Sequence, residues 1–478
     1  MTLDRNTFFI DNEWASPASS RTFEIVGAST GEVIATVPEA VEADVDRAVA
    51  AARRALASGE WAQATPAQRA AIMRRFIAAI ASRTDVIANM VSIQNGMPIS
   101  LSAQLEAQFP LGVLDYYAGL AETLGSPDIR PSQVGRETLV ERSPVGVVAA
   151  IVPWNFPVAL AISKIAPAMA AGCTLVIKPS PGTILDSYVL AEAALEAGVP
   201  AGVLNWVAAD RDVGAYLVEH PGIDKVAFTG STGAGRNVAA RCGQLLRPVT
   251  LELGGKSASI LLEDADLDQF IQGMPMTSML NNGQACFNGT RVLVPGSRYA
   301  EVVDAMAETM SGLVMGDALD PATEVGPMAS SLHRDRVEGY IGKGRQEARL
   351  VSGGGRPQLD KGWFVEPTLF ADVDNSMTIA REEIFGPVLA VIKYDGDEEA
   401  IRIANDSDFG LGGSVWGADS ERALGVARAV SSGTVGINGY MPSLGSPFGG
   451  IKASGMGREF GPEAIGGYQQ LKSIYVMG

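Results

Sequence analysis

The 478-residue sequence is poor in histidine and cysteine, and both shortages exclude kinds of active site. Its only histidines are His220 and His333, so a histidine-rich metal site is excluded and a histidine-based triad nearly so. We therefore expect no metal, and we expect any general base to be a carboxylate or a lysine. Three cysteines make no disulfide framework, which indicates a reducing compartment.

Positive charge is also scarce, because 37 Lys and Arg stand against 54 Asp and Glu for a net charge of −17. Nucleic acids and anionic membranes bind proteins with clustered positive charge, so neither is expected as a partner. The longest apolar runs, such as residues 145–152, are far shorter than the ~20 residues that span a bilayer. The N-terminus lacks the basic and apolar regions of a signal peptide. The sequence thus predicts a cytoplasmic protein.

Apolar residues make up 47% of the chain and charged residues 19%, which is typical of globular proteins. Single cores stop growing near ~250–300 residues, so we expect two or three domains. In residues 143–255, apolar runs of strand length alternate with helical stretches, which indicates an α/β fold with a parallel sheet covered on both faces. The predicted strands are residues 145–152, 174–177, 203–208, 225–228 and 249–253. The predicted helices are residues 157–171, 184–197, 213–219 and 231–242, preceded by two more at 41–56 and 66–83.

Residues 254–256, Gly-Gly-Lys, read as a hinge into a second α/β unit. Its predicted strands are residues 258–262, 291–294, 387–394, 412–416 and 433–437. The glycine-rich stretches 353–355 and 443–455 are predicted to be loops. Residues 127–142 read as a hairpin that belongs to neither core, and residues 469–476 read as a strand.

Cys286 lies in a polar loop flanked by glycines, just before a predicted strand. A reactive cysteine needs such an accessible, polar setting, whereas a structural cysteine prefers apolar neighbours. From local context alone, a nucleophilic role and a structural role for Cys286 are about equally supported. Cys173 and Cys242 lie at the ends of buried elements and are predicted to be small core residues.

Glu252 points away from the apolar side chains of its own predicted strand. A carboxylate at the end of a buried strand is disfavoured unless it is paired or functional. One alternative is a salt bridge with Lys256 or Lys178. The other is a general base, since burial raises the pKa of a carboxyl group in the direction that a base needs.

Two more polar residues follow predicted strands, where parallel sheets bind ligands. The amide of Asn155 suits an oxyanion, although an ordinary N-cap before Pro157 is the stronger alternative for that residue alone. Lys178 suits a ribose hydroxyl or a phosphate, or is a strand-end lysine whose ammonium group reaches solvent.

Residues 230–236 and Glu383 are weaker candidates. The glycines of residues 230–236 precede a helix and allow backbone N–H groups to approach an anion, but a plain turn has the same pattern. The carboxylate of Glu383 can accept two ribose hydroxyl hydrogen bonds, or it is a solvated loop charge.

Taken in order along the chain, these stretches resemble the aldehyde dehydrogenase superfamily. The resemblance covers nearly the whole sequence, and it is specific because seven modest motifs occur in register. The motifs are PWNFP at 153–157, KPS at 178–180, FTGSTG at 228–233, LELGGK at 251–256, GQAC at 283–286, EEIFGP at 382–387 and SPFGGIK at 446–452.

The resemblance implies three domains. A Rossmann-like domain that binds NAD(P) would comprise residues 1–125 and 144–254, and an α/β catalytic domain residues 255–452. A small β domain, residues 126–143 and 453–478, would serve oligomerisation. Its open strand edges invite pairing with another chain, so we expect a homodimer or homotetramer.

The resemblance also implies a role for individual residues. Cys286 matches the nucleophile, Glu252 the general base and Asn155 the side-chain donor of the oxyanion hole. Lys178 is predicted to belong both to the catalytic set and to the cofactor site, because it matches the lysine that binds the adenosine ribose. Glu383 matches the carboxylate that binds the nicotinamide ribose. The other expected cofactor-binding residues are Ile151, Pro153, Trp154, Ser180, Pro181, Gly214, Phe228, Gly230, Ser231, Leu253 and Phe385. The expected substrate tunnel contains Phe156, Leu160, Ser163, Phe287 and Phe448.

One departure concerns the cofactor. Three residues after Lys178, where many NAD-specific members carry a glutamate, this sequence has Pro181. Proline can neither bind the ribose hydroxyls nor repel a 2′-phosphate. We therefore expect NAD as the preferred cofactor, with NADP possible.

The expected reaction is oxidation of an aldehyde to the carboxylic acid. It would pass through a thiohemiacetal and a thioester on Cys286, and water activated by Glu252 would hydrolyse the thioester. One alternative is a CoA-acylating enzyme, but that subgroup typically lacks the glutamate that Glu252 matches. The other is a catalytically silent protein of the same fold, which has no reason to keep Cys286, Glu252 and Asn155 together. The sequence does not identify the aldehyde.

Overall fold

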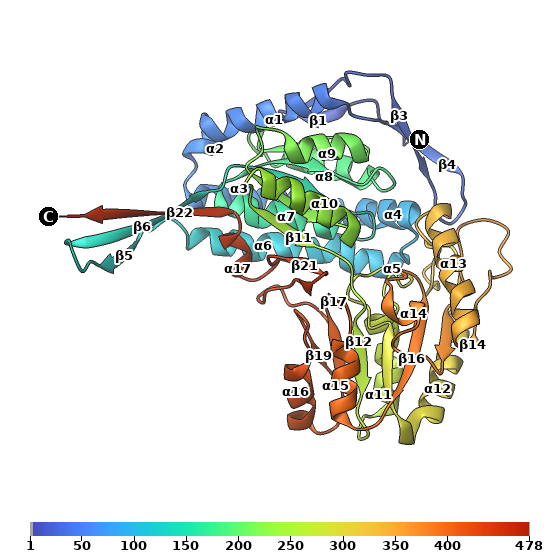
Figure 1. Cartoon of the computed structure of the whole chain (residues 1–478). Helices are drawn as coiled ribbons and strands as arrows, with labels where there is room; N and C mark the ends of the chain where they lie inside the picture. Colours follow the sequence, from blue (N-terminus) through green and yellow to red (C-terminus); the bar gives the residue numbers. More distant parts are fainter. Residues whose placement is uncertain (1–2, 478) are drawn as a thin grey trace.

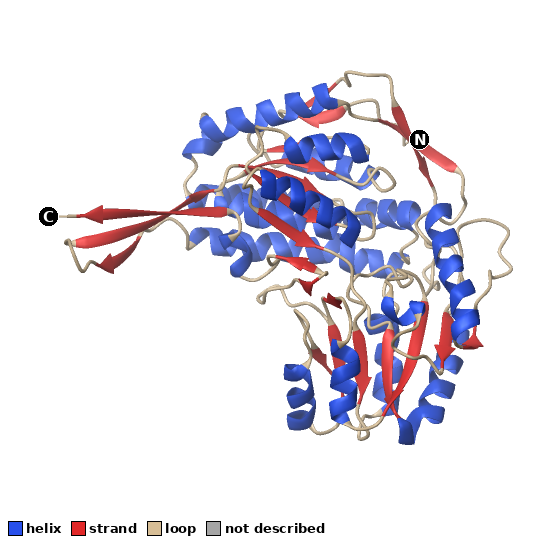
Figure 2. Ribbon diagram, viewed as in Figure 1, coloured by secondary structure: helices blue, strands red, loops and turns tan. Residues whose placement is uncertain are grey.

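The computed structural model describes residues 3–477 and contains two large sheets and a projecting three-stranded sheet (Figure 1). Helices cover the two large sheets, which confirms the predicted α/β class (Figure 2). Residues 1–2 and 478, the outermost ends of the predicted first and third domains, lie outside the described residues.

The first sheet has eight strands, in the order β2-β1-β9-β8-β7-β10-β11-β21. Its five central strands are parallel, as predicted. They are β7 (Val147–Ile151), β8 (Thr174–Lys178), β9 (Leu204–Trp206), β10 (Lys225–Thr229) and β11 (Val249–Glu252). Antiparallel strands complete the edges: β1 (Phe8–Ile10), β2 (Glu13–Ala15) and β21 (Gly455–Met456).

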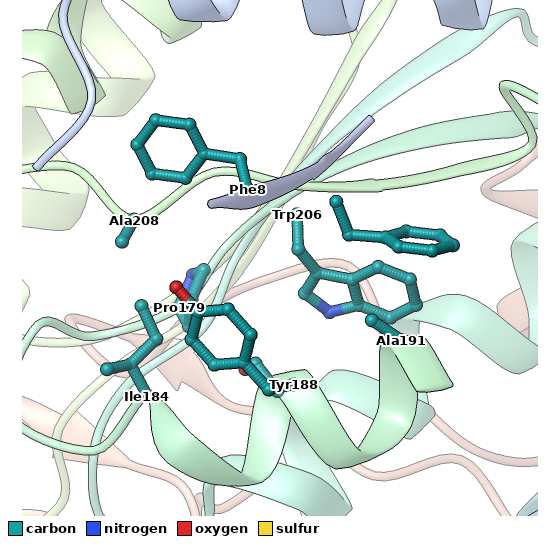
Figure 3. Close-up of a pocket in the computed structure, with 9 residues that line it drawn as sticks. Phe8, Pro179, Ile184, Tyr188, Ala191, Trp206 and Ala208 are labelled. Atoms are coloured by element: carbon teal, nitrogen blue, oxygen red, sulfur yellow. The ribbon is translucent and has the colours of Figure 1, made fainter. Parts of the chain in front are cut away.

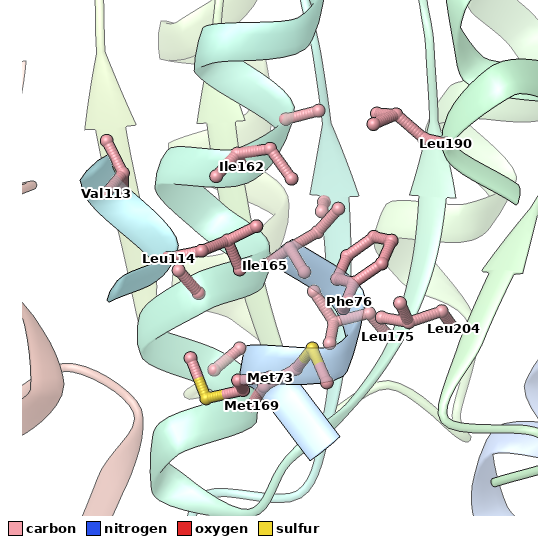
Figure 4. Packing of buried hydrophobic residues seen from close by; sticks show 14 of the residues in the cluster. Met73, Phe76, Val113, Leu114, Ile162, Ile165, Met169, Leu175, Leu190 and Leu204 are labelled. Carbon is pink, nitrogen blue, oxygen red and sulfur yellow. The ribbon is translucent and has the colours of Figure 1, made fainter. Parts of the chain in front are cut away.

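Helices pack on both faces of this sheet. One face carries α1 (Glu42–Ala57), α9 (Arg211–Glu219) and α10 (Thr232–Gln244). The other carries α3 (Pro66–Ala81), α6 (Phe109–Glu122), α7 (Pro157–Ala171) and α8 (Leu185–Glu196). In Figure 4, Met73, Phe76 and Leu114 from the outer helices converge on Ile165 and Met169 of α7, so α7 is buried on nearly every side. A short helix, α2 (Glu60–Gln63), follows α1.

Residues 84–122 form a helical stretch that was not predicted in detail. It consists of α4 (Thr84–Asn95), α5 (Ile99–Ser102), η1 (Ala103–Gln108) and α6. Within it, η1 is a π-helical turn, because Phe109 N–H donates to the carbonyl of Gln104 five residues earlier. Among residues 3–477, no single helix is long and apolar enough to cross a membrane, and α3 and α4 meet that test only as a pair bent by 68°.

The second sheet has seven strands, in the order β14-β15-β16-β13-β12-β18-β19. The five predicted strands are present as β12 (Ala258–Leu261), β13 (Arg291–Pro295), β16 (Val388–Tyr394), β18 (Gly413–Trp416) and β19 (Gly436–Ile437). Two strands were not predicted, β14 (Arg349–Ser352) and β15 (Thr368–Ala371). Both are short, and proline directly before β15 at Pro367 gives that segment the pattern of a loop.

The helices of this second unit cover its sheet (Figure 1). They are α11 (Leu267–Ser278), η2 (Gly296–Arg298), α12 (Tyr299–Gly312), α13 (Ser331–Glu347), α14 (Thr378–Arg381), α15 (Asp397–Asn405) and α16 (Ser420–Ala429). The predicted loop 443–455 is mostly irregular but contains a short strand, β20 (Ile451–Lys452), which pairs with β17 (Phe409–Gly410).

The third sheet projects from the body and ends near the C-terminus (Figure 1). It contains β5 (Asp128–Pro131), β6 (Glu137–Pro144) and β22 (Gln469–Val476), all antiparallel. Both predicted parts are present, although residues 453–468 do not belong to this sheet and include β21 of the first sheet and α17 (Glu463–Gly466). By strand pairing, the C-terminal part of the third sheet begins at Gln469 and not at the predicted boundary, residue 453. A further hairpin near the N-terminus joins β3 (Thr22–Val26) and β4 (Val33–Pro38).

Candidate active site

The predicted catalytic residues converge between the two large sheets. Asn155 lies in the loop after β7, Lys178 ends β8 and Glu252 ends β11, so all three lie at the carboxyl edge of the first sheet. Cys286 lies in the loop between α11 and β13 of the second unit. The site therefore requires both sheets.

Cys286 lines two cavities at once. One is an apolar tunnel of about 660 Å³, and the other is a more polar pocket of about 650 Å³. The two cavities therefore meet at this one residue. This position suits a nucleophile that receives one reactant from each side.

The polar pocket contains most of the residues expected near a nicotinamide. The predicted residues on its wall are Pro153, Trp154, Asn155, Gly230, Ser231, Leu253, Glu383 and Phe385. Sequence reasoning missed four others, Thr229, Gly254, His333 and Arg336. The Ser231 hydroxyl caps α10 by accepting a hydrogen bond from Ala234 N–H, and the helix N-terminus beside this pocket favours a phosphate group.

A second polar groove of about 810 Å³ contains Lys178. Ile151, Gly214 and Phe228, which are predicted to bind the cofactor, share its wall with Arg211, Asn237 and Arg241. Ser180 and Pro181 are on the wall of neither polar cavity and stay predictions. A Cβ at Gly214 would lie 3.0 Å from Lys178 Cε, so glycine leaves room for this side chain.

Lys178 is buried without an acidic partner in the described part of the chain. Its Nζ donates to the carbonyl of Pro179 at 3.3 Å. Burial lowers the pKa of Lys178 to about 8, and the nearby charge of Asp210 opposes that shift. A buried ammonium group with donors to spare fits a hydroxyl-bearing ligand.

The tunnel is apolar and aromatic. Phe156, Leu160, Phe287 and Phe448 line it, and their contact with substrate stays a prediction. The other lining residues are Leu105, Phe109, Ala159, Leu280, Met441, Pro442, Glu459 and Phe460. Ser163 is not on this wall, because its hydroxyl turns into the protein and donates to Glu459 Oε2 at 3.0 Å.

Asn155 is held by side chains from both units. Its backbone carbonyl accepts hydrogen bonds from the Asn95 amide at 3.1 Å and the Asn281 amide at 2.9 Å. Its own Nδ2 donates to the carbonyl of Gln284 at 3.0 Å, two residues before Cys286. Asn155 does not cap α7, because the N-cap position is Phe156, so the ordinary alternative is wrong. No motif identified Asn95 or Asn281 in the sequence.

Glu252 is buried, 3% exposed, and makes no salt bridge with Lys256 or Lys178. Neither carboxylate oxygen has a hydrogen-bond partner among residues 3–477. Burial raises the pKa of Glu252 well above its usual range, and the charge of Glu459 raises it further. A Cβ at Gly449 would lie 2.6 Å from Oε1, so glycine is needed there. Glu252 lines neither the tunnel nor the polar pocket, and its burial and raised pKa are compatible with a general base, a role that stays a prediction.

Glu459 and Lys164 form a buried ion pair that no sequence motif indicated. Lys164 Nζ lies 2.6 Å from Glu459 Oε1 and 2.6 Å from Thr229 Oγ1. Glu459 lines the tunnel, and Thr229 lines the polar pocket. The pair therefore neutralises the one acidic side chain on the tunnel wall.

The thiol of Cys286 is protonated in this arrangement. Burial raises its pKa, and the negative charges of Glu383 and Glu252 raise it further. A nucleophilic reaction at this sulfur would therefore require a base that takes the proton of the thiol. Cys173 and Cys242 are fully buried core residues, as predicted.

Helix α13 holds the loop that carries Glu383. Glu383 Oε1 accepts a hydrogen bond from Gly255 N–H at 2.8 Å, and Arg336 donates to the Glu383 carbonyl at 2.6 Å. His333 Nε2 lies 2.6 Å from the carbonyl of Phe385, a residue with a positive φ of 65°. Burial lowers the pKa of His333 to about 4, so the ring is neutral and Nε2–H donates. Glu383 is thus a fixed residue and not a freely solvated charge.

A separate small cavity lies on the far side of Pro179 (Figure 3). It measures about 240 Å³ and is lined mainly by apolar side chains, including Phe8, Tyr188 and Trp206. It holds none of the predicted catalytic groups. Among the described residues, no three His, Cys, Asp or Glu side chains are grouped as a metal site.

The model of the aldehyde dehydrogenase family matches residues 14–474. This chain belongs to that family. It is 60% identical over 478 residues, the full length of both chains, to geranial dehydrogenase of Castellaniella defragrans. It is also 41% identical to a putative aldehyde dehydrogenase of Bacillus subtilis, over 98% of this chain and 95% of the other.

Solved structures agree with this aldehyde dehydrogenase assignment. The aldehyde dehydrogenase of Mycobacterium tuberculosis complexed with NAD+ is 46% identical, with a TM-score of 0.97 over 99% of this chain and 98% of that one. An aldehyde dehydrogenase of Pseudomonas syringae, complexed with NAD+ and octanal, is 39% identical, with a TM-score of 0.95 over 99% and 97%. The family and fold class predicted from the sequence are confirmed.

Proposed function

We propose that this aldehyde dehydrogenase oxidises an apolar aldehyde of the geranial type to its carboxylic acid, with NAD as the cofactor. The position of Cys286 carries the proposal, because the thiol lies where the apolar tunnel meets the polar pocket. An aldehyde in the tunnel and a cofactor in the pocket would approach this sulfur from opposite sides.

The residues of the two polar cavities fit a dinucleotide. Lys178 offers a buried donor for one ribose, the N-terminus of α10 suits the phosphates, and Glu383 offers carboxylate oxygens for the second ribose. The similar structures that hold NAD+ support the same choice. When bound, NAD supplies the hydride acceptor.

In the first half-reaction the Cys286 thiol gives up its proton to water in the cavity, and Sγ forms a bond with the aldehyde carbon. The carbonyl oxygen becomes an oxyanion, for which Asn155 has a donor to spare, because Nδ2 carries two hydrogens and Gln284 takes one. One such donor is worth ~3–4 kcal/mol in the transition state. Loss of hydride from the same carbon then restores its C=O bond and leaves a thioester on Cys286.

The second half-reaction belongs to Glu252. Its unpaired carboxylate takes a proton from water, whose oxygen attacks the thioester carbon. The carbon–sulfur bond then breaks, the acid leaves and Cys286 is regenerated. The raised pKa of Glu252 brings its basicity closer to neutral pH, where a general base is most efficient.

The tunnel supports an apolar substrate. Its wall is formed largely by aromatic and aliphatic side chains, and its one acid, Glu459, is neutralised by Lys164. Betaine aldehyde dehydrogenases, which are 39–40% identical to this chain, are named for an aldehyde that carries a permanent cation. Such a cation would find no free negative charge on this wall and could be attracted only by the aromatic rings, so we expect it to be a weaker substrate than an apolar aldehyde.

The test is NADH formation, followed by absorbance, with geranial, octanal and betaine aldehyde in parallel reactions with and without CoA. We expect turnover with geranial and octanal, little with betaine aldehyde, and no dependence on CoA. A requirement for CoA would favour the acylating alternative, and no NADH with any aldehyde would contradict the proposal.

A further inference from the structure

The N-terminus of α7 has no cap of its own. Phe156 occupies the N-cap position and makes no side-chain cap, and Pro157 has no N–H to donate. The next two backbone donors, those of Val158 and Ala159, are buried. Buried backbone N–H groups require a partner from elsewhere in the fold.

Glu106 satisfies both donors from the π-helical turn η1. Its Oε2 accepts hydrogen bonds from Val158 N–H at 2.7 Å and from Ala159 N–H at 3.3 Å. The side chain is 0% exposed, and its other oxygen, Oε1, has no hydrogen-bond partner in the described residues. A carboxyl group also suits the positive end of the α7 dipole.

The two elements that Glu106 joins both line the tunnel. Leu105 lies in η1, and Phe109 begins the helix that follows it. Phe156, Ala159 and Leu160 come from the start of α7. π-helical turns occur frequently at functional sites, and this one directs Glu106 into α7 while its neighbours face the substrate cavity.

The same contact lies close to the oxyanion donor. Asn155 immediately precedes the capped turn, and its carbonyl is fixed by Asn95 and Asn281. Movement of the α7 N-terminus would move the tunnel wall formed by Phe156 and Leu160, and it would strain the bonds that hold Asn155 directly before it.

We propose that Glu106 is a positioning residue for aldehyde oxidation, because its bonds to Val158 and Ala159 lock the start of α7 against η1 and so fix the tunnel wall. Glu106 is on the wall of neither the tunnel nor the polar pockets. The inference rests on the proposed function, since it takes the tunnel as the aldehyde site.

The two backbone donors need an acceptor oxygen, whatever the charge of Glu106. Burial raises the pKa of this carboxyl group well above its usual range, and the donors at Val158 and Ala159 lower it in part. A glutamine at this position keeps an acceptor oxygen at the same reach, whereas aspartate retracts it by one methylene and alanine removes it.

The kinetic experiment compares Glu106→Ala, Glu106→Asp and Glu106→Gln with the wild type. We expect Ala and Asp to raise the KM for geranial about tenfold and to lower kcat, because buried donors lose their partner. The KM for NAD should stay within about twofold, and Gln should restore the aldehyde parameters to within about threefold. Asp44→Asn is the matched control, because Asp44 is equally buried, accepts hydrogen bonds from the backbone N–H groups of Ala18 and of Val41 at the start of α1, and lines none of these cavities.

Hydrogen exchange followed by mass spectrometry tests the contact independently of turnover. Peptides that contain Val158 and Ala159 should exchange faster in Glu106→Asp and at the wild-type rate in Glu106→Gln. An unchanged exchange rate in Glu106→Asp overturns the inference, as does a parallel rise of both KM values, which would indicate general loosening. A wild-type enzyme that oxidises no aldehyde would contradict the proposed function, while the exchange data would still decide the role of Glu106.

Discussion

The side-chain amide of Asn155 donates a hydrogen bond to the backbone carbonyl of Gln284, 3.0 Å away. Asn155 follows a strand of the first sheet, whereas Gln284 belongs to the loop of the second unit that carries Cys286. The bond therefore sets the distance between the proposed oxyanion donor and the nucleophile. Correct catalytic geometry depends on how the two units fit together.

Asn155→Ala should lower kcat about 10²–10³-fold, because the oxyanion loses one donor. The KM for NAD should rise less than kcat falls, since the groove around Lys178 is untouched although Asn155 itself lines the polar pocket. Steady-state kinetics with octanal measure both values. A fall of less than about threefold would mean that another group stabilises the oxyanion.

Cys286→Ala should abolish aldehyde oxidation while the protein still folds and binds NAD. Cys242→Ala is the matched control, because Cys242 is fully buried and lines none of the cavities described above. NADH formation measures turnover, and calorimetric titration with NAD measures cofactor binding. More than a trace of turnover in Cys286→Ala would show that this thiol is not the nucleophile.

Glu252→Gln should form NADH in a burst that approaches one equivalent per site, followed by a steady phase slowed about 10²–10⁴-fold. The amide keeps the shape of the side chain but cannot take a proton from water. Intact-mass analysis should then find an acyl group on Cys286. Loss of the burst as well would show that Glu252 also generates the thiolate.

The pH profile should carry the signature of the same residue. The pKa of Glu252 is raised by burial and by Glu459, so the carboxyl group is protonated and inactive up to a higher pH than an ordinary glutamate. Deacylation should rise as the pH rises through this pKa and then level off. Stopped-flow measurement of the steady phase across pH tests this. If the wild-type rate does not rise with pH, Glu252 is not the general base.

NAD should be the preferred cofactor, as the similar NAD+ complexes indicate, but NADP should also be accepted at neutral pH and its use should fall at alkaline pH. Pro181 brings no negative charge to repel a 2′-phosphate, and Lys178, Arg211 and Arg241 line the groove. The pKa of Lys178 is about 8, so its positive charge is lost above that pH and attraction for the phosphate weakens. The KM ratio of the two cofactors between pH 7 and pH 9 measures this, and strict NADP dependence would contradict it.

Removal of residues 469–478 should convert a dimer or tetramer into monomers. β22 pairs with β6 along its whole length, and Leu471 and Tyr475 on this strand are each 67% exposed. Exposed apolar strands of that kind are suited to pairing with another chain. Light scattering at micromolar concentration measures the mass, and a monomeric wild-type protein would refute the prediction.

The sequence predicted elements whose patterns are local. The five buried strands of the first sheet and α7 were found because apolar runs and glycine ends are visible in the sequence. The placements of Asn95, Lys164 and Glu459 depend on contacts between residues far apart in the chain, which no local pattern contains. Ser163 was predicted for the tunnel wall, but the buried acid Glu459 turns its hydroxyl inward.

The apolar tunnel and the polar pocket have Cys286 as the one residue common to both linings. If the tunnel holds the aldehyde as proposed, substitutions at Met441 or Phe460 should alter which aldehyde fits without touching the polar pocket. The tunnel and the polar pocket are thus separate cavities that share only the proposed nucleophile. The residues of the tunnel can therefore change during evolution, and with them the preferred aldehyde, while the residues of the proposed cofactor pocket stay the same.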